Sequence, residues 1–168
     1  MTHPSWELPV SDNDAALVLT ACPGTKGTDL QASLEQLKEQ GVEAIVTALS
    51  YEEMEKAGVA ELPELTRELG MHWCYQPIED DCAPNQDFDS GWQENSPKLQ
   101  SILDNGGKVA LHCMGGSGRT GLLAAHVLLQ RGWDLDTIKA EVKERRPSAF
   151  TKSVQVEYID AVAKQATK

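Results

Sequence analysis

A cysteine and an arginine separated by five residues enclose a segment that is rich in glycine. The segment reads His112-Cys113-Met114-Gly115-Gly116-Ser117-Gly118-Arg119-Thr120. Glycine readily adopts positive φ, so successive N–H groups of such a loop can turn inward and form a nest for an anion. A guanidinium beside the nest can donate two parallel hydrogen bonds to phosphate oxygens, a fork that lysine cannot reproduce. The segment therefore predicts a site for an oxyanion such as phosphate.

Cys113 would stand at the edge of this nest, where it could act as a nucleophile. A helix is expected to begin near Gly118, and the positive end of its dipole favours a thiolate over a thiol. The hydroxyl of Thr120 could donate to the sulfur. A thiolate next to a bound phosphate can attack phosphorus and form a covalent intermediate. A buried structural cysteine is the alternative, and the glycine loop that follows Cys113 disfavours it.

The apolar pattern predicts the elements that position this loop. Short apolar runs predict buried strands at 16–20, 44–49, 71–78 and 108–112. Helices are predicted at 28–40, 61–69, 87–103 (in its later half), 118–130, 134–145 and 153–164. The first would open on a capping box of Thr28 with Gln31. This alternation predicts an α/β fold, a single domain with a central, mainly parallel sheet of four to five strands flanked by helices on both faces.

The composition predicts one globular domain over residues 1–168, with residues 1–14 loosely ordered. The formal net charge of −11 would repel nucleic acid and anionic lipid, which argues against both as partners. The first residues lack the regions of a secretory signal, and no apolar run approaches a membrane span, so we expect a cytoplasmic protein. The histidines lack ligand spacing, so we expect no metal and no other cofactor. A monomer is expected.

The segment around Cys113 resembles the signature His-Cys-x5-Arg-Ser/Thr of the cysteine-dependent protein tyrosine phosphatase superfamily. Its flanks, Ala21-Cys22-Pro23-Gly24 and Gln76-Pro77-Ile78-Glu79-Asp80, and the final helix are similar to the cyclin-dependent kinase inhibitor 3 group, a compact dual-specificity branch. The likeness runs from about Ala16 to Ile159. It implies a protein tyrosine phosphatase-like fold. It also implies a protein phosphatase that hydrolyses phosphotyrosine, and phosphoserine or phosphothreonine as well, through a phosphocysteine intermediate.

The resemblance also implies a role for each matching residue. Cys113 would be the nucleophile, Arg119 would bind the transition state, and Asp80 would be the general acid. His112 would hold the cysteine backbone, and Gln155 would position the attacking water. The chain departs from the branch after Asp80, so Asp81 stays open as the acid. The residues expected to bind the phosphate are Met114, Gly115, Gly116, Ser117, Gly118 and Arg119.

The loop residues also bear on the substrate. Met114 and Ser117 are uncharged, whereas phosphoinositide phosphatases of this superfamily tend to carry lysines in the loop. A phosphorylated protein is therefore the expected partner. The alternatives are a sulfurtransferase or an arsenate reductase-like thiol enzyme, for which Cys82 could be the resolving cysteine, and a non-catalytic phosphoprotein-binding module.

Two side features stay open at this stage. Cys82 is either an inert loop thiol or a reversible disulfide partner of Cys113 under oxidation. Arg145, Arg146 and Lys152 either flank the cleft and guide an anionic substrate or form a solvated helix end that the helix dipole favours.

Overall fold

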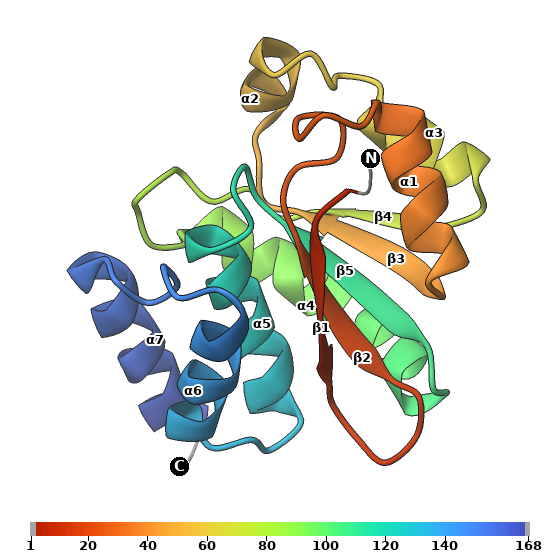
Figure 1. The fold of residues 1–168 in the computed structure, drawn as a ribbon. Helices are drawn as coiled ribbons and strands as arrows, with labels where there is room; N and C mark the ends of the chain where they lie inside the picture. Colours follow the sequence, from red (N-terminus) through yellow and green to blue (C-terminus); the bar gives the residue numbers. More distant parts are fainter. Residues whose placement is uncertain (1–2, 167–168) are drawn as a thin grey trace.

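Five strands form one sheet in the order β1-β2-β5-β3-β4 in the computed structural model, which describes residues 3–166 (Figure 1). The bounds of the strands are β1 (Ser5–Pro9), β2 (Ala16–Thr20), β3 (Val42–Thr47), β4 (His72–Tyr75) and β5 (Lys108–His112). β1 pairs antiparallel with β2, and every other pairing is parallel. The predicted α/β class with a mainly parallel sheet of four to five strands is confirmed.

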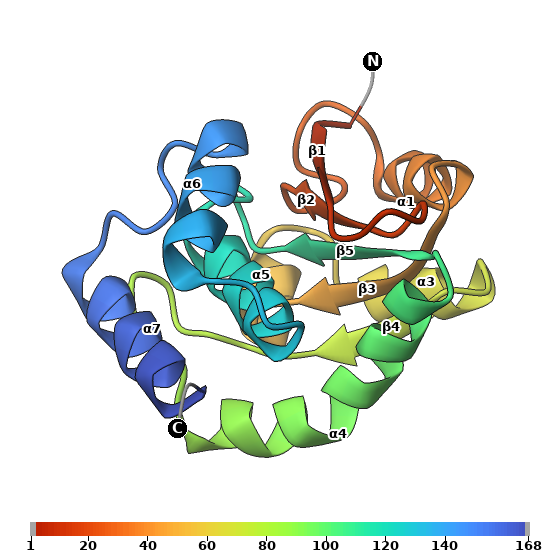
Figure 2. The same ribbon diagram turned by 90° about the horizontal axis from the view of Figure 1, so that it is seen from below.

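Helices cover both faces of this sheet because its strands alternate apolar side chains between the faces. The helices are α1 (Leu30–Glu39), α2 (Tyr51–Lys56), α3 (Leu62–Glu68), α4 (Gln86–Asp104), α5 (Gly118–Gln130), α6 (Leu135–Arg145) and α7 (Ser153–Ala166). Leu17 and Leu19 of β2 join the larger core formed with α4 to α7, whereas Val18 joins the smaller core under α1. Figure 2 shows α1 and α3 lying well apart from α5, α6 and α7.

The N-terminal segment differs from its sequence prediction. Residues 1–14 were expected to be loosely ordered; residues 1–2 lie outside the described part of the chain, and Ser5–Pro9 forms β1, an edge strand of the sheet. Leu8 is buried in the larger core, and Trp6 packs against the same core. The apolar side chains at alternate positions explain the strand, because burial of one face holds a short edge strand in register.

Three helices also differ from the prediction. The cap of α1 is Asp29, whose carboxylate accepts from the Ala32 N–H at 2.7 Å, rather than Thr28. Helix α4 is helical throughout, because Asn85 caps it and apolar side chains of its first half, such as Phe88, are buried. Helix α2 was not predicted, although Ser50 starts it with a complete capping box.

The carboxyl ends of three parallel strands lie in one row. His112, the last residue of β5, is in register with Thr20 of β2 and with Thr47 of β3. The loops that follow these strands therefore meet at one edge of the sheet, where Figure 1 also places α2 and the connection from β5 to α5. Between residues 3 and 166, no helix is both long and apolar enough to cross a membrane.

Candidate active site

The loop from Cys113 to Arg119 joins β5 to α5, and at one of its glycines the neighbouring backbone leaves no room for a side chain. Gly116 has a φ of +84°, and a Cβ there would lie 2.8 Å from the carbonyl carbon and oxygen of Thr20. Neither Gly115 nor Gly118 has positive φ. Gly118 instead opens α5. The loop therefore turns at Gly116 while pressed against the end of β2.

Both sides of the loop are tied to the neighbouring strand ends. The Cys22 N–H, just after β2, donates to the Met114 carbonyl at 2.9 Å, and the Ala48 N–H, just after β3, donates to the His112 carbonyl at 3.0 Å. These two bonds come from the segments that follow β2 and β3, which flank β5 in the sheet. Hydrogen bonds from the segments after β2 and β3 thus hold the loop on both sides.

The fully buried His112 ring supports the loop from beneath. One ring nitrogen, Nε2, lies 2.7 Å from Thr47 Oγ1, and the other, Nδ1, lies 3.0 Å from the Cys113 carbonyl oxygen. Burial lowers the pKa of His112 to about 4, and a hydrogen bond to the Cys113 carbonyl opposes this only in part. The ring is therefore neutral near pH 7 and can connect Thr47 to the cysteine backbone without bringing a charge beneath the loop.

The sulfur of Cys113 accepts a hydrogen bond from the buried hydroxyl of Thr120 at 3.1 Å. Cys113 is only 3% exposed, but it lines a cavity of about 380 Å³ that opens at this edge of the sheet. The other residues that line the cavity are Asp80, Asp81, Met114, Gly115, Ser117, Gly118, Arg119, Ser148, Thr151, Lys152 and Gln155. The structure thus brings the predicted nucleophile, arginine, acid candidates and glutamine to one cavity, whereas His112, Gly116 and Thr120 do not line it.

Arg119 is almost fully buried and is held by a residue that the sequence prediction missed. Its Nη1 donates to both carboxylate oxygens of Glu53, at 3.0 and 2.9 Å, and to the Ile78 carbonyl at 3.0 Å. Its Nη2 lies 3.6 Å from Asp80 Oδ1. No local pattern links Glu53 to Arg119, which follows it by 66 residues. The capping-box spacing of Ser50 and Glu53 was the only signal available for this part of the chain.

The two acid candidates lie side by side in the chain but differ in their contacts. Asp80 has a side chain that is 72% exposed and approaches Arg119, whereas Asp81 lies 3.6 Å from Lys152 Nζ. Asp81 also has a φ of +61°, a conformation that non-glycine residues seldom adopt. Asp80 is therefore the carboxylate on the arginine side of the cavity, and Asp81 is the one on the lysine side.

Gln155 of α7 lines the cavity, and a hydrogen bond from its amide nitrogen holds its side chain in place. Its Nε2 donates to the Cys82 carbonyl at 3.1 Å, while its Oε1 is buried and has no hydrogen-bond partner in the described part of the chain. The Oε1 lies near Gly118, 3.4 Å from where a Cβ there would stand. Cys82 itself does not line the cavity, and its redox role stays a prediction. No group of three or more histidine, cysteine or acidic residues within 3–166 is arranged to hold a metal ion.

The two arginines before Pro147 do not line the cavity, although Lys152 does. Arg145 donates to the Glu7 carbonyl of β1 and pairs with Glu141. Arg146 donates to carbonyl oxygens of the Cys113 loop. Neither position is simply a solvated helix end.

Sheet, loop and helix together define a fold of the protein tyrosine phosphatase type. A solved structure of kinase associated phosphatase, with its catalytic-site cysteine replaced by serine, superposes with a TM-score of 0.85 at 24% identity and covers 99% of this chain and 97% of that one. The chain belongs to the cyclin-dependent kinase inhibitor 3 (CDKN3) family, whose model matches residues 2–141.

Two named relatives show the extent of this match. The cyclin-dependent kinase inhibitor 3 of Rattus norvegicus is 34% identical over an alignment of 131 positions, and the match covers 74% of this chain and 60% of the relative. The protein of that name from Homo sapiens is 33% identical over an alignment of 144 positions, and the match covers 83% of this chain and 65% of the relative. The chain therefore spans less than two thirds of the length of these curated relatives.

Proposed function

We propose that this chain is a protein phosphatase that hydrolyses phosphotyrosine, and phosphoserine or phosphothreonine as well, through a phosphocysteine intermediate. One observation carries the proposal. The Cys113 sulfur accepts the Thr120 hydroxyl at 3.1 Å and shares a cavity with Arg119, whose guanidinium is fixed by Glu53. A nucleophile and an oxyanion clamp are thus held together before any substrate arrives. Membership of the CDKN3 family and the phosphatase-type fold support this assignment.

In the first step, the Cys113 thiolate attacks phosphorus as the bond from phosphorus to the substrate oxygen breaks. The Nη2 of Arg119 and the loop N–H groups bind the three remaining oxygens, whose charge must be stabilised in the transition state. Asp80 donates a proton to the leaving oxygen, so the product departs as a neutral hydroxyl. The position of Asp80 at the arginine side of the cavity supports it over Asp81 as this acid.

In the second step, water attacks the phosphocysteine and releases phosphate and the thiolate. Asp80, now a carboxylate, takes a proton from that water. The Gln155 Oε1 is a free acceptor beside the loop, and the bond from Nε2 to the Cys82 carbonyl fixes its direction, which suits it to hold the water. The Thr120 hydroxyl stabilises the departing thiolate, because a hydrogen bond favours the charged form of sulfur.

The cavity also supports a phosphorylated protein as the substrate. Its volume of about 380 Å³ suits one phosphorylated side chain, and the loop residues Met114 and Ser117 bring no charge to bind a second phosphate. The net charge of −11 disfavours nucleic acid and anionic membrane surfaces. A monomeric, cytoplasmic enzyme that needs no metal or other cofactor is part of this proposal.

The test is turnover of p-nitrophenyl phosphate in EDTA, with orthovanadate as inhibitor. We expect Cys113→Ser to abolish turnover and Cys82→Ser, the matched control outside the cavity lining, to leave it unchanged. Rapid acid quench of the wild-type protein with a radiolabelled phosphopeptide should trap label on Cys113. Near-normal turnover by Cys113→Ser would overturn the proposal, as would a strict metal requirement.

The same proteins separate the rival functions. Reduction of arsenate that is lost in Cys82→Ser, without phosphatase turnover, would indicate a reductase, and thiosulfate consumption would indicate a sulfurtransferase. Tight binding of phosphopeptides with no hydrolysis by the wild-type protein would indicate a binding module.

A further inference from the structure

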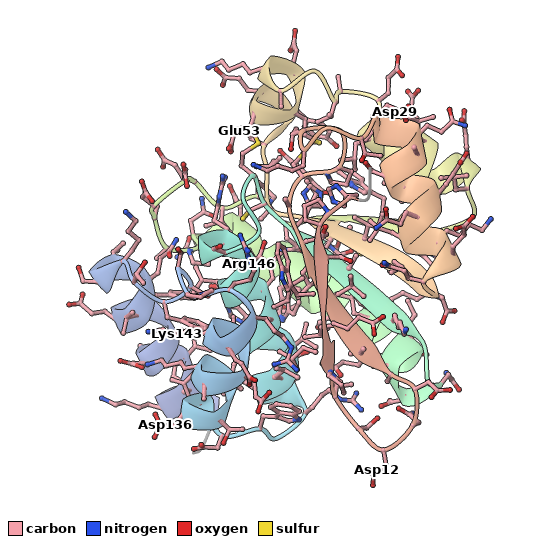
Figure 3. All side chains as sticks on the ribbon, in the orientation of Figure 1. Asp12, Asp29, Glu53, Asp136, Lys143 and Arg146 are labelled. Carbon is pink, nitrogen blue, oxygen red and sulfur yellow. The ribbon has the colours of Figure 1, made fainter. Side chains whose placement is uncertain are left out.

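Arg146 connects the Cys113 loop to the edge strand β1. It follows the last turn of α6, and its half-buried side chain reaches two carbonyl groups of the loop. Its Nη2 donates to the Gly115 carbonyl at 2.8 Å, and its Nε donates to the Gly116 carbonyl at 3.1 Å. Its guanidinium carbon lies 3.9 Å from the ring centroid of Trp6, a residue of β1. Figure 3 labels Arg146 beside the start of α5.

These two hydrogen bonds determine which way two peptide groups of the loop face. In a trans peptide the carbonyl and the N–H point in opposite directions, and no described peptide bond here is cis. The Gly115 carbonyl shares its peptide group with the Gly116 N–H, and the Gly116 carbonyl shares its peptide group with the Ser117 N–H. With both carbonyls held toward Arg146, both N–H groups must point to the opposite side of the loop.

The opposite side of the loop is where the cavity lies. Gly115 and Ser117 line the cavity beside Cys113, whereas Arg146 does not line it. The glycines themselves provide little resistance to a peptide flip, because glycine populates both signs of φ. A guanidinium on the outer face supplies that resistance, since a flip would break a charge-assisted hydrogen bond and turn a carbonyl dipole toward the anion.

The Trp6 ring holds the guanidinium in place. A cation over the face of a tryptophan ring is attracted to it, and at 3.9 Å the contact is close. The ring also covers one face of the guanidinium from water, so the fork toward the two carbonyls is preorganised. β1, which completes the sheet at its edge, thus reaches the loop through Arg146.

We propose that Arg146, held by Trp6, is a positioning residue that points the Gly116 and Ser117 N–H groups into the oxyanion site. It acts through the loop and does not touch the phosphate itself. Its effect on the affinity for an oxyanion does not depend on whether the protein is a phosphatase. Its effect on turnover rests on the phosphatase activity proposed above.

The experiment compares Arg146→Ala and Arg146→Lys with Arg145→Ala. Arg145 is the matched control because it is adjacent, carries the same charge and also contacts β1, but makes no bond to the loop. The dissociation constant for tungstate, measured by titration calorimetry, is the primary readout. Turnover of p-nitrophenyl phosphate and the melting temperature are measured on the same samples. Rescue of Arg146→Ala by millimolar guanidinium, with equal sodium chloride as the control, tests the missing fork directly.

We expect Arg146→Ala to weaken tungstate binding and lower kcat/KM by about tenfold to a hundredfold, because small misplacements of binding groups cost that much. Arg146→Lys should lie between, since a single ammonium cannot hold both carbonyls. Tungstate affinity and kcat/KM of Arg145→Ala should stay within about twofold of the wild type. Guanidinium should partly restore both in Arg146→Ala and in no other variant. If Arg146→Ala does not fold, Arg146→Lys and Trp6→Leu, at unchanged melting temperature, carry the comparison.

The proposal is overturned if Arg146→Ala binds tungstate within twofold of the wild type. If Arg146→Ala fails to fold, the same result in both Arg146→Lys and Trp6→Leu overturns it. An equal loss in Arg145→Ala also overturns it, since that would be a general effect of charge. If the wild type binds tungstate but never turns over p-nitrophenyl phosphate, the phosphatase proposal fails. The role of Arg146 is then still decided by tungstate affinity.

Discussion

The buried Arg119 and the partly exposed Glu53 form an ion pair in which both carboxylate oxygens accept from one guanidinium nitrogen, at 3.0 and 2.9 Å. The other terminal nitrogen, Nη2, stays near the cavity and approaches Asp80. Since an arginine side chain has several rotatable bonds, this anchoring determines where its free face points. The short helix α2, which supplies Glu53, therefore helps to shape the site although it contributes nothing to the lining of the cavity.

Replacing Glu53 by glutamine should lower kcat/KM for p-nitrophenyl phosphate by about tenfold to a hundredfold. The amide keeps the size and can still cap α2, but it loses the charge that orients Arg119, and misorientation of a binding group is costly in rate. The control is Glu52→Gln, whose exposed side chain pairs only with Lys56 one turn away. Equal kinetics of the two variants would show that the pair does not position Arg119.

Replacing Asp80 by asparagine should slow hydrolysis of a phosphotyrosine peptide by about 10²- to 10⁴-fold, the usual contribution of one general acid. The loss should be smaller for p-nitrophenyl phosphate, because nitrophenolate leaves readily without a proton. Asp81→Asn is the matched control, and asparagine tolerates the positive φ at that position. A large loss in Asp81→Asn with normal Asp80→Asn would assign the acid to Asp81.

Replacing Gly116 by alanine should destabilise the protein. A side chain there is strained at a φ of +84° and would lie 2.8 Å from the backbone of Thr20, so something must shift. A residue forced into the left-handed region costs about 1–2 kcal/mol before the clash is counted. Gly115→Ala is the control for stability, because its Cβ would meet nothing within 4 Å. Urea unfolding compares the two variants, and an equal loss in both would contradict the close contact with β2.

Stability should fall as the pH drops from about 6.5 toward 4. Burial lowers the pKa of His126 to about 4, and that of His112 likewise to about 4, whereas a histidine in the unfolded chain titrates near 6.5. The unfolded chain therefore takes up protons in this range that the folded chain does not, and each histidine contributes up to about 3 kcal/mol of loss.

The variant His126→Gln isolates one of these groups. Its free energy of unfolding in urea, measured between pH 7.5 and 4.5, should fall less steeply than that of the wild type. Other titrating groups are shared by both proteins and cancel in the difference. Parallel pH curves for the two proteins would show that His126 does not titrate as its burial indicates.

Sequence reasoning reached the parts of the site that local chemistry encodes. The bounds of β5 and α5 follow from an apolar run that ends at His112 and a helix that begins at Gly118, and both match the structure. The loop between them carries its own signature of glycines. Short elements were harder to find. Helix α2 has one buried residue, Met54, and β1 is a five-residue edge strand, so neither shows a strong hydrophobic period.

The supporting residues of the site could not be predicted for a different reason. Glu53 pairs with Arg119 across 66 positions, and Arg146 reaches Gly116 across 30. Such pairs depend on how the sheet orders its strands, which a single sequence does not specify. The sequence left Arg146 between a cleft-flanking cation and a solvated helix end, but its two bonds to loop carbonyls give it a third role.

The hydrogen bonds from the Cys22 N–H to Met114 in the Cys113 loop and from the Ala48 N–H to His112, just before the loop, have a consequence for how the site responds to temperature and denaturant. Because hydrogen bonds from the segments after both neighbouring strands hold the loop and its entrance, we expect the loop to lose its structure only when β2, β5 and β3 separate. Amide hydrogen exchange at Cys22 and Ala48 should accordingly be as slow as in the middle of the sheet. The loop would then be rigid before an oxyanion binds, and binding would order almost none of the backbone.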